Sequence, residues 1–268
     1  MIDFHNHTIP NLDDGPKSIE DSLQMFKEAE KQGITDVINT VHYQHPKMDG
    51  KDTSYKNIIL KINEMNGVLI DNNINIKIHP ASEVFYLPNL IEILDNKITT
   101  FGKGKYMLIE FQTLSLPNGY KEEFYKLMLK GTSPIIAHPE RYREIQADIS
   151  IVKEWVDLGY IIQIDCGSIL GQFGEKIKKT SYELIKNNLC HIIGSDSHNS
   201  EKRNFCLLPA YKEIENNISS DYVTFLKNNI DRIFNGKEIN SHIYNNKESK
   251  NGRIKKILSF LETKVSKL

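Results

Sequence analysis

The sequence predicts an α/β fold in which about seven parallel strands close wholly or partly into a barrel. Short β-branched apolar runs alternate with longer segments of helical periodicity from one end of the chain to the other. Repeated units of a strand followed by a helix favour parallel strands covered by helices, and so many units within 268 residues favour a barrel over an open sheet. No internal repeat and no linker rich in Pro, Gly or Ser divides the chain, so we expect residues 1–268 to form a single domain.

The predicted strands are short runs rich in Ile, Val and aromatic residues. They cover residues 2–5, 36–41, 76–81, 106–111, 134–137, 161–166 and 191–195. Between them, apolar residues at helical spacing predict helices over residues 18–32, 55–71, 119–130, 149–158 and 182–188. The first helix opens at Ser18 with Asp21 three residues later, and Gly33, Gly131 and Gly159 stand where helices would end.

The C-terminal stretch, residues 235–268, has a different composition. Residues 235–252 are polar and rich in Asn and Lys, which predicts a loop or a loosely held segment. Apolar residues then recur at helical spacing among lysines over 254–268, which predicts a basic amphipathic helix. The favoured interpretation is a helix that packs back on the domain, while oligomerisation through it and a weak contact with a membrane surface stay open.

The charge balance limits the classes of partner. The chain has 34 Lys plus Arg against 35 Asp plus Glu, a formal net charge of -1 with its nine histidines neutral. Such a chain lacks the positive field that non-specific nucleic-acid binding needs, so we expect no nucleic-acid partner. The sequence shows neither a signal peptide nor an apolar stretch long enough to cross a bilayer, so we expect no integral membrane span and a cytoplasmic location.

Histidines and acidic residues recur where the predicted strands end. His5 and His7 stand two positions apart at the end of the first strand, so both imidazoles can point to the same side. Further along the chain come Asp13, Asp14, His42, Glu83, Glu110, His138, Asp196 and His198. In a barrel the carboxyl ends of the strands converge on one mouth, so we expect these side chains to become neighbours.

Such a collection of polar side chains predicts a metal site. Each residue alone is common at the end of a strand. Buried together at one mouth, however, these polar groups would destabilise the fold unless a ligand bound them. Imidazoles and carboxylates without thiolates suit Mn, Zn or Fe better than a structural zinc, and carboxylates can bridge two ions. Asp13 is an alternative to Asp14 as a ligand, although it is more simply interpreted as the residue that fixes the Asp-Gly turn.

Short motifs containing these residues follow one another over residues 1 to about 210. They are His5-x-His7, Asp13-Asp14-Gly15-Pro16, Val41-His42, Ala81-Ser82-Glu83, Ile109-Glu110-Phe111, Ala137-His138-Pro139-Glu140-Arg141 and Gly194-Ser195-Asp196-Ser197-His198. In this order they resemble the polymerase-and-histidinol-phosphatase (PHP) superfamily. Within it they resemble the manganese-dependent bacterial protein-tyrosine phosphatases that regulate capsule and exopolysaccharide synthesis. The resemblance is most specific at the opening I-D-F-H-N-H with D-D-G-P and at A-H-P-E-R.

The resemblance implies a distorted (β/α)7 barrel, similar to a TIM barrel, that holds three divalent metal ions. Mn is the expected metal, with Fe, Zn, Co or Mg as alternatives. By resemblance, the first ion is held by His5, His7, Glu83 and Asp196. The second is held by Glu83 as the bridging acid, Glu110 and His138, and the third by Asp14, His42 and His198. Arg141 and Arg203 match the phosphate-binding arginines of the family.

The implied activity is hydrolysis of phosphotyrosine in a protein. The expected partner is a bacterial tyrosine autokinase of a polysaccharide operon. In the expected mechanism a metal-bound hydroxide attacks phosphorus while the ions and arginines relieve charge on the phosphoryl oxygens. A tyrosyl leaving group, with a pKa of about 10, departs more easily than an alkoxide, so a general acid is not required. Tyr43, Gln44, Phe85 and Tyr86, which follow ligands, are candidates to line the substrate cleft, with ordinary packing of the aromatic residues as the alternative.

Other functions fit the sequence less well. The alternative is a PHP-type phosphatase of a small metabolite such as histidinol phosphate. A PHP nuclease is disfavoured by the balanced charge, and a non-catalytic metal-binding domain by the completeness of the ligand set.

Cysteine-based catalysis is excluded by spacing. A thiolate phosphatase of the common type needs an Arg six positions after its Cys. The residues at that position are Gln172, Asp196 and Lys212 for Cys166, Cys190 and Cys206 respectively. The three cysteines are therefore interpreted as small buried hydrophobes in a reducing compartment.

Overall fold

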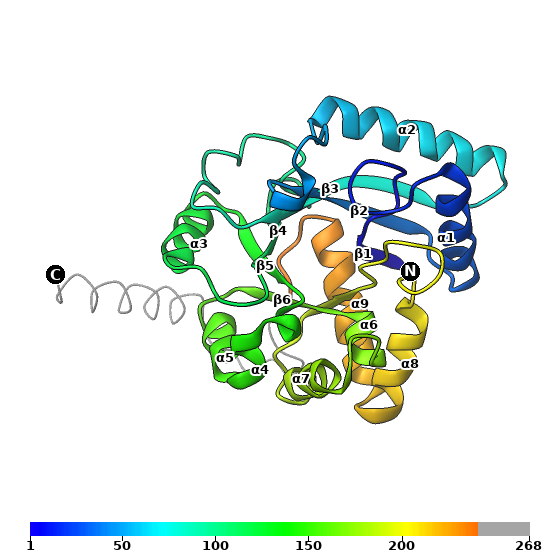
Figure 1. Cartoon of the computed structure of the whole chain (residues 1–268). Coiled ribbons are helices and arrows are strands. Elements are labelled where there is room, and N and C mark those ends of the chain that lie inside the picture. Colours follow the sequence, from blue (N-terminus) through cyan, green and yellow to red (C-terminus); the bar gives the residue numbers. More distant parts are fainter. Residues whose placement is uncertain (241–268) are drawn as a thin grey trace.

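Seven parallel strands follow one another in chain order around a sheet that nearly closes into a barrel (Figure 1). The structure, a computed structural model, describes residues 1–240. The strands are β1 (Ile2–Asn6), β2 (Asp36–Tyr43), β3 (Lys77–Phe85), β4 (Tyr106–Glu110), β5 (Ser133–Ala137), β6 (Ile161–Asp165) and β7 (Ile192–Gly194). Just beyond β7, the Asp196 amide donates to the carbonyl of His5 at 2.7 Å and joins the last strand to the first. The predicted seven-stranded barrel is thus confirmed.

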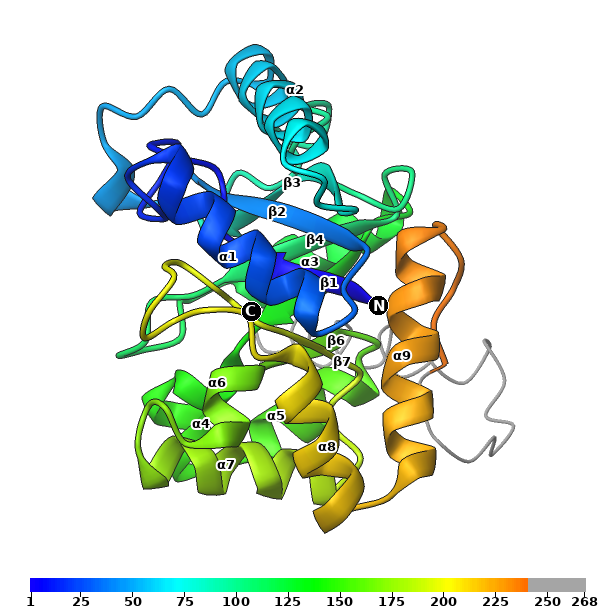
Figure 2. The same cartoon turned by 90° about the vertical axis from the view of Figure 1, so that its right-hand side faces the viewer.

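Helices cover the outside of the barrel and one of its ends. They are α1 (Ile19–Lys31), α2 (Tyr55–Asp71), α3 (Tyr120–Leu129), α4 (Arg143–Ala147), α5 (Ser150–Asp157), α6 (Cys166–Leu170), α7 (Glu175–Lys186), α8 (Leu207–Asn217) and α9 (Ser220–Phe234), with short 3-10 turns at Pro46–Met48 and Pro139–Arg141. In Figures 1 and 2, α2 lies on one side of the barrel and α4, α5 and α7 on the other.

The helix predictions were confirmed for α1, α2, α3 and α5, whereas for α7 the predicted start was wrong. That helix begins at Glu175 rather than at residue 182, because its buried face includes small polar residues, Thr180 and Ser181, which the apolar pattern does not count. Helices α4, α6, α8 and α9 were not predicted.

Helix α9 closes the end of the barrel from which the strands start, on the right in Figure 2. Its Ile230 and Ile233 are buried in one apolar cluster with inward-facing strand residues such as Phe4, Leu108 and Ile135. Since this end is filled with apolar side chains, the opposite end, where the strands finish, is the only open mouth of the described barrel.

No helix within residues 1–240 is both long enough and apolar enough to cross a bilayer. The predicted amphipathic helix, at residues 254–268, and most of the predicted polar segment lie outside the described residues. The single-domain assignment for residues 1–268 stays a prediction.

Tyr142 fixes the ends of two strands that carry site residues. Its hydroxyl donates to the carbonyl of Ala137 at 2.7 Å and accepts from the amide of Phe111 at 3.0 Å, and the side chain is buried. Tyr142→Phe leaves two buried backbone groups without this partner. We therefore expect the free energy of unfolding to fall by about 1–3 kcal/mol in urea denaturation. Tyr55→Phe, at an exposed tyrosine, is the control, and an equal loss there would contradict the role of the Tyr142 hydroxyl.

Candidate metal centre

The strand ends surround a cavity of about 410 Å³ at the barrel mouth. Its wall includes most of the predicted site residues: Asp14, His42, Glu83, Glu110, His138, Arg141, Asp196, His198 and Arg203. His5, in β1, and His7, just after it, lie against this wall and are fully buried. The structure therefore brings together all the predicted metal ligands and both predicted arginines, although they come from almost the whole length of the chain.

The first group of ligand atoms is deep in the mouth. His5 Nε2 lies 3.2 Å from Glu83 Oε2 and 3.5 Å from Asp196 Oδ1. His7 Nε2 lies 3.4 Å and 3.5 Å from the same two oxygens. Two imidazoles and two carboxylates thus converge on one point, and they are the residues predicted for the first ion.

Glu83 reaches groups on both sides of it. Its Oε1 lies 2.8 Å from His138 Nε2, while its Oε2 lies 3.3 Å from His42 Nδ1. Glu110 Oε1 lies 3.1 Å from the same His42 nitrogen. Potential ligand sets therefore form around Glu83 with His5 and His138, and with His42 and Glu110. This geometry suits a bridging acid, and the partition of ligands among separate ions stays a prediction.

A further group lies nearer the solvent. Asp14 Oδ1 is 3.2 Å from His198 Nε2 and 3.4 Å from His42 Nε2, and His7 completes the cluster. The Asp14 side chain is 42% exposed, whereas the other members are buried. The structure places Asp14 rather than Asp13 in this group.

The histidines are oriented by partners on the nitrogen that faces away from the centre. His7 Nδ1 is 2.7 Å from Asp13 Oδ2, and His5 Nδ1 is 3.0 Å from Gln163 Oε1. Asp13 also accepts from the amide of Gly15, so it is both a turn residue and an orienting partner. Such hydrogen bonds fix the tautomer and the ring orientation of metal-binding histidines.

Buried ligand atoms without hydrogen bonds show that this donor set fits metal ions. Within residues 1–240, hydrogen-bond partners are lacking for the buried atoms His5 Nε2, His7 Nε2, His42 Nδ1, Glu83 Oε2, Glu110 Oε1 and Asp196 Oδ1. Buried polar atoms are nearly always satisfied, and leaving one unpaired is costly. All six atoms are imidazole nitrogens or carboxylate oxygens, which are the ligand types of Mn, Zn and Fe.

The two deepest carboxylates are held in the ionised form. Burial disfavours the charge on Glu83, but the imidazoles of His5 and His138 outweigh it and hold the pKa of Glu83 well below its usual range. Burial acts in the same way on Asp196, and the guanidinium of Arg141 is the main group that holds the pKa of Asp196 well below its usual range. The centre therefore presents anionic oxygens, which divalent cations require.

Two site residues follow their strands with left-handed backbone. His138, after β5, has φ of 32°, and Asp196, after β7, has φ of 48°. Residues other than glycine rarely adopt this region, and such conformations cluster at functional sites.

Arg141 and Arg203 meet at one carboxylate oxygen on the cavity wall. Asp196 Oδ2 lies 2.8 Å from Arg141 Nη2 and 2.6 Å from Arg203 Nη2, and Arg141 also pairs with Asp165. The Nε atoms of both arginines are buried and lack a hydrogen-bond partner among the described residues. Each guanidinium therefore has donors to offer to an anion that enters the mouth.

Gln163 and Asp165, which lie in β6 and support the site, were not predicted from the sequence. The signal was present, because these two polar residues alternate within a strand that is otherwise isoleucine. Phe173, whose ring faces both arginines, was not predicted either. Of the candidates for the substrate cleft, Phe85 lines the cavity, and Tyr86 is buried against Phe111.

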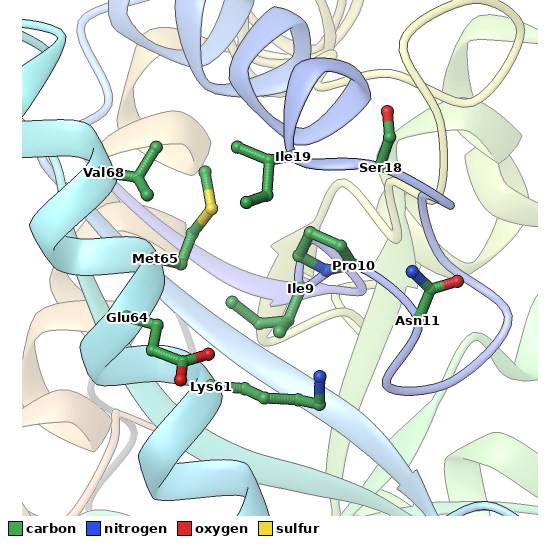
Figure 3. Close-up of a pocket in the computed structure, with 9 residues that line it drawn as sticks. All are labelled: Ile9, Pro10, Asn11, Ser18, Ile19, Lys61, Glu64, Met65 and Val68. Carbon is green, nitrogen blue, oxygen red and sulfur yellow. The ribbon is translucent and has the colours of Figure 1, made fainter.

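A second cavity, of about 220 Å³, lies outside the mouth (Figure 3). The loop after β1 and helix α2 line it with Ile9, Pro10, Asn11, Ser18, Ile19, Lys61, Glu64, Met65 and Val68. Among these side chains only Glu64 is of a metal-ligating type, so the mouth is the better candidate for the active site. The three cysteines are free and buried, as predicted.

A nearly closed β/α barrel with clustered imidazoles, carboxylates and arginines at its mouth defines the class of metal-dependent hydrolases. The chain belongs to the CpsB/CapC family of capsular polysaccharide synthesis, whose family model matches residues 1–235.

Named relatives agree with this assignment. The chain is 32% identical over 240 residues to the tyrosine-protein phosphatase YwqE of Bacillus subtilis, covering 89% of this chain and 93% of the relative. It is 31% identical over 221 residues to the tyrosine-protein phosphatase CpsB of Streptococcus agalactiae, covering 80% and 89%. The chain also resembles a solved structure, with a TM-score of 0.84 and 33% sequence identity. The match covers 90% of this chain and 96% of the chain in the solved structure. That structure comes from work on YwqE from Bacillus subtilis and CpsB from Streptococcus pneumoniae, described as unique metal-dependent tyrosine phosphatases.

Proposed function

We propose that this metal-dependent tyrosine phosphatase acts on a bacterial tyrosine autokinase that controls capsule or exopolysaccharide synthesis. The observation that carries the phosphatase activity is the convergence of the ligand cluster and both arginines on Asp196, in one cavity open to solvent. The names of the relatives support phosphotyrosine as the substrate, and the family description supports the capsule context.

The proposal includes three divalent ions, with Mn as the first choice. The residues that would hold them are His5, His7, Asp14, His42, Glu83, Glu110, His138, Asp196 and His198. When bound, such ions activate water as a nucleophile and relieve charge on phosphoryl oxygens. The chain itself holds the ligands in place. Asp13 hydrogen-bonds to His7, and Gln163 hydrogen-bonds to His5.

In this proposal Arg141 and Arg203 bind the oxygens of the phosphoryl group. Their Nη2 atoms already contact a carboxylate oxygen of Asp196, and their Nε donors have no partner among residues 1–240. Guanidinium donors in a fixed planar arrangement suit the three equatorial oxygens of a phosphoryl group in transfer.

Part of the cavity wall suits an aromatic ring. Phe85, Phe111 and Leu114 line it together with His45, which contacts Phe85 edge to face with centroids 5.0 Å apart. An apolar wall of this kind favours a phosphotyrosine side chain over a short polar phosphomonoester. The tyrosyl oxygen is also a good leaving group, which is consistent with a mechanism without a strong general acid.

A cytoplasmic location is part of the proposal. The buried free cysteines, Cys166, Cys190 and Cys206, are consistent with a reducing compartment.

The substrate assignment is tested by comparing turnover of a phosphotyrosine peptide, a phosphoserine peptide and histidinol phosphate by the Mn-loaded protein. We expect the highest kcat/KM on the phosphotyrosine peptide. Equal or better turnover of histidinol phosphate would replace the proposed substrate by a small metabolite.

Replacing Arg203 by Ala tests the role of the arginines. We expect kcat/KM to fall by about a hundredfold, through a higher KM or a lower kcat, because one donor to the phosphoryl oxygens is removed. Metal content, measured by elemental analysis, should stay unchanged. Arg143→Ala, at an exposed arginine two residues from Arg141, is the matched control. Loss of metal from the Arg203 variant would mean that this residue supports the metal centre instead.

A further inference from the structure

Phe173 lies in the loop between α6 and α7 and faces both arginines of the site. Its ring centroid is 4.3 Å from Arg141 Cζ and 5.7 Å from Arg203 Cζ. The ring is half-buried, so part of it is already covered by protein. One aromatic side chain therefore contacts the two guanidiniums that also share Asp196.

The surrounding backbone is shaped to admit this ring. A Cβ atom on Gly167, in α6, would lie only 2.9 Å from Phe173 Cε2, so the absence of a side chain there makes room for the ring. The loop is bounded by Gly171 and Gly174, whose φ values of 85° and 95° favour glycine.

Asp165 links this loop to the arginines. Its Oδ1 accepts from the amide of Gly167 at 2.8 Å and so caps α6, while its Oδ2 pairs with Arg141. The end of β6, helix α6 and the loop that carries Phe173 thus form one unit around the Arg141 guanidinium.

A ring in this position can immobilise the two guanidiniums without blocking their N–H donors. The face of an aromatic ring attracts a guanidinium, and stacking uses the flat face of the cation while leaving its N–H edges free for an anion. An arginine that is already immobilised loses less side-chain entropy when it binds a ligand. Phe173 therefore favours an arrangement of Arg141 and Arg203 that is ready for a phosphoryl group.

We propose that Phe173 is a positioning residue that holds Arg141 and Arg203 in the geometry that binds phosphoryl oxygens. The proposal rests on the proposed function, since it takes a phosphoryl group as the anion at these arginines. It extends to inorganic phosphate, the product of hydrolysis, because the product presents the same oxygens to the same donors.

The test compares Phe173→Leu with Phe173→Tyr in the Mn-loaded protein, with inorganic phosphate as the probe in titration calorimetry. We expect Phe173→Leu to weaken phosphate binding by about threefold to tenfold, the range for a partly covered cation–π contact. KM for a phosphotyrosine peptide should rise by a similar factor with kcat little changed, since binding is lost in the ground state and the transition state alike. Phe173→Tyr keeps the ring and should stay within about twofold of the wild type.

Phe234→Leu is the matched control, because Phe234 is a half-buried phenylalanine of α9 at the opposite end of the barrel. It should leave phosphate binding unchanged. The proposal is overturned if Phe173→Leu binds phosphate as the wild type does, if Phe173→Tyr loses as much as Phe173→Leu, or if Phe234→Leu causes the same loss. Failure of the wild type to hydrolyse phosphotyrosine, with the expected calorimetric differences intact, would reject the proposed substrate and leave the role of Phe173 supported.

Discussion

Asp196→Asn is expected to lower kcat/KM on a phosphotyrosine peptide by about a thousandfold or more, together with a loss of bound metal. The two oxygens of Asp196 have different tasks. Oδ1 faces the imidazoles of His5 and His7, both at 3.5 Å, and Oδ2 accepts from the two arginines. An asparagine has one oxygen and one NH2 group, so whichever way it turns, a donor faces either the metal ligands or a guanidinium.

The losses of activity and of metal in Asp196→Asn should arise at the site and not from unfolding of the protein. Asn has nearly the shape of Asp, so thermal unfolding of the variant should remain cooperative. Kinetics and elemental analysis of the purified variant measure the two expected losses. Asp157→Asn, at an exposed position of α5, removes one carboxylate charge far from the mouth and should behave as the wild type. Asp196→Asn with more than about a tenth of wild-type kcat/KM would contradict the double role of this carboxylate.

His138→Ala is expected to lower kcat/KM by about a hundredfold to a thousandfold and to remove part of the bound metal. His138 Nε2 lies 2.8 Å from Glu83 Oε1, and its ring stacks on that of His5 with centroids 5.7 Å apart. The substitution removes one ligand and leaves Oε1 of the buried Glu83 carboxylate without its hydrogen-bond partner. Metal content and kcat/KM, measured on the same preparation, report both effects.

The matched control is His79→Ala. His79 lies in β3, near the opposite end of the barrel, where it pairs with Asp36 at 2.8 Å and packs against Phe234. Its loss should leave metal content and activity near the wild-type values. If His138→Ala lost activity but kept all its metal, His138 would not be a ligand.

The site could be predicted from the sequence because strand geometry is regular. Extended backbone from the end of β1 to the next residue puts His5 and His7 on one side, and the parallel barrel collects the ends of strands far apart in sequence. The strands β2 and β3 run further than predicted, to Tyr43 and Phe85, because they pair in register over their full length up to Tyr43 and Val84. Longer pairing also explains why His42 and Glu83 lie within strands rather than after them.

What the sequence did not reveal depends on contacts between distant segments. Helix α8 contains Pro209 in its first turn, where proline is tolerated, but a proline there is easily interpreted as a loop. Helix α9 shows its role only when Ile230 and Ile233 meet the inside of the barrel. Phe173 was missed for a similar reason, because its partners lie about 30 residues away on either side in the sequence and α6 was not predicted.

The most direct test of the account is to measure metal content and phosphotyrosine hydrolysis on one preparation, before and after a chelator. We expect about three divalent ions per chain, loss of activity when they are removed, and recovery when Mn is added back. The buried, unpaired ligand atoms at the mouth are the reason for this expectation. Full hydrolysis of the phosphotyrosine peptide by protein freed of metal would contradict it.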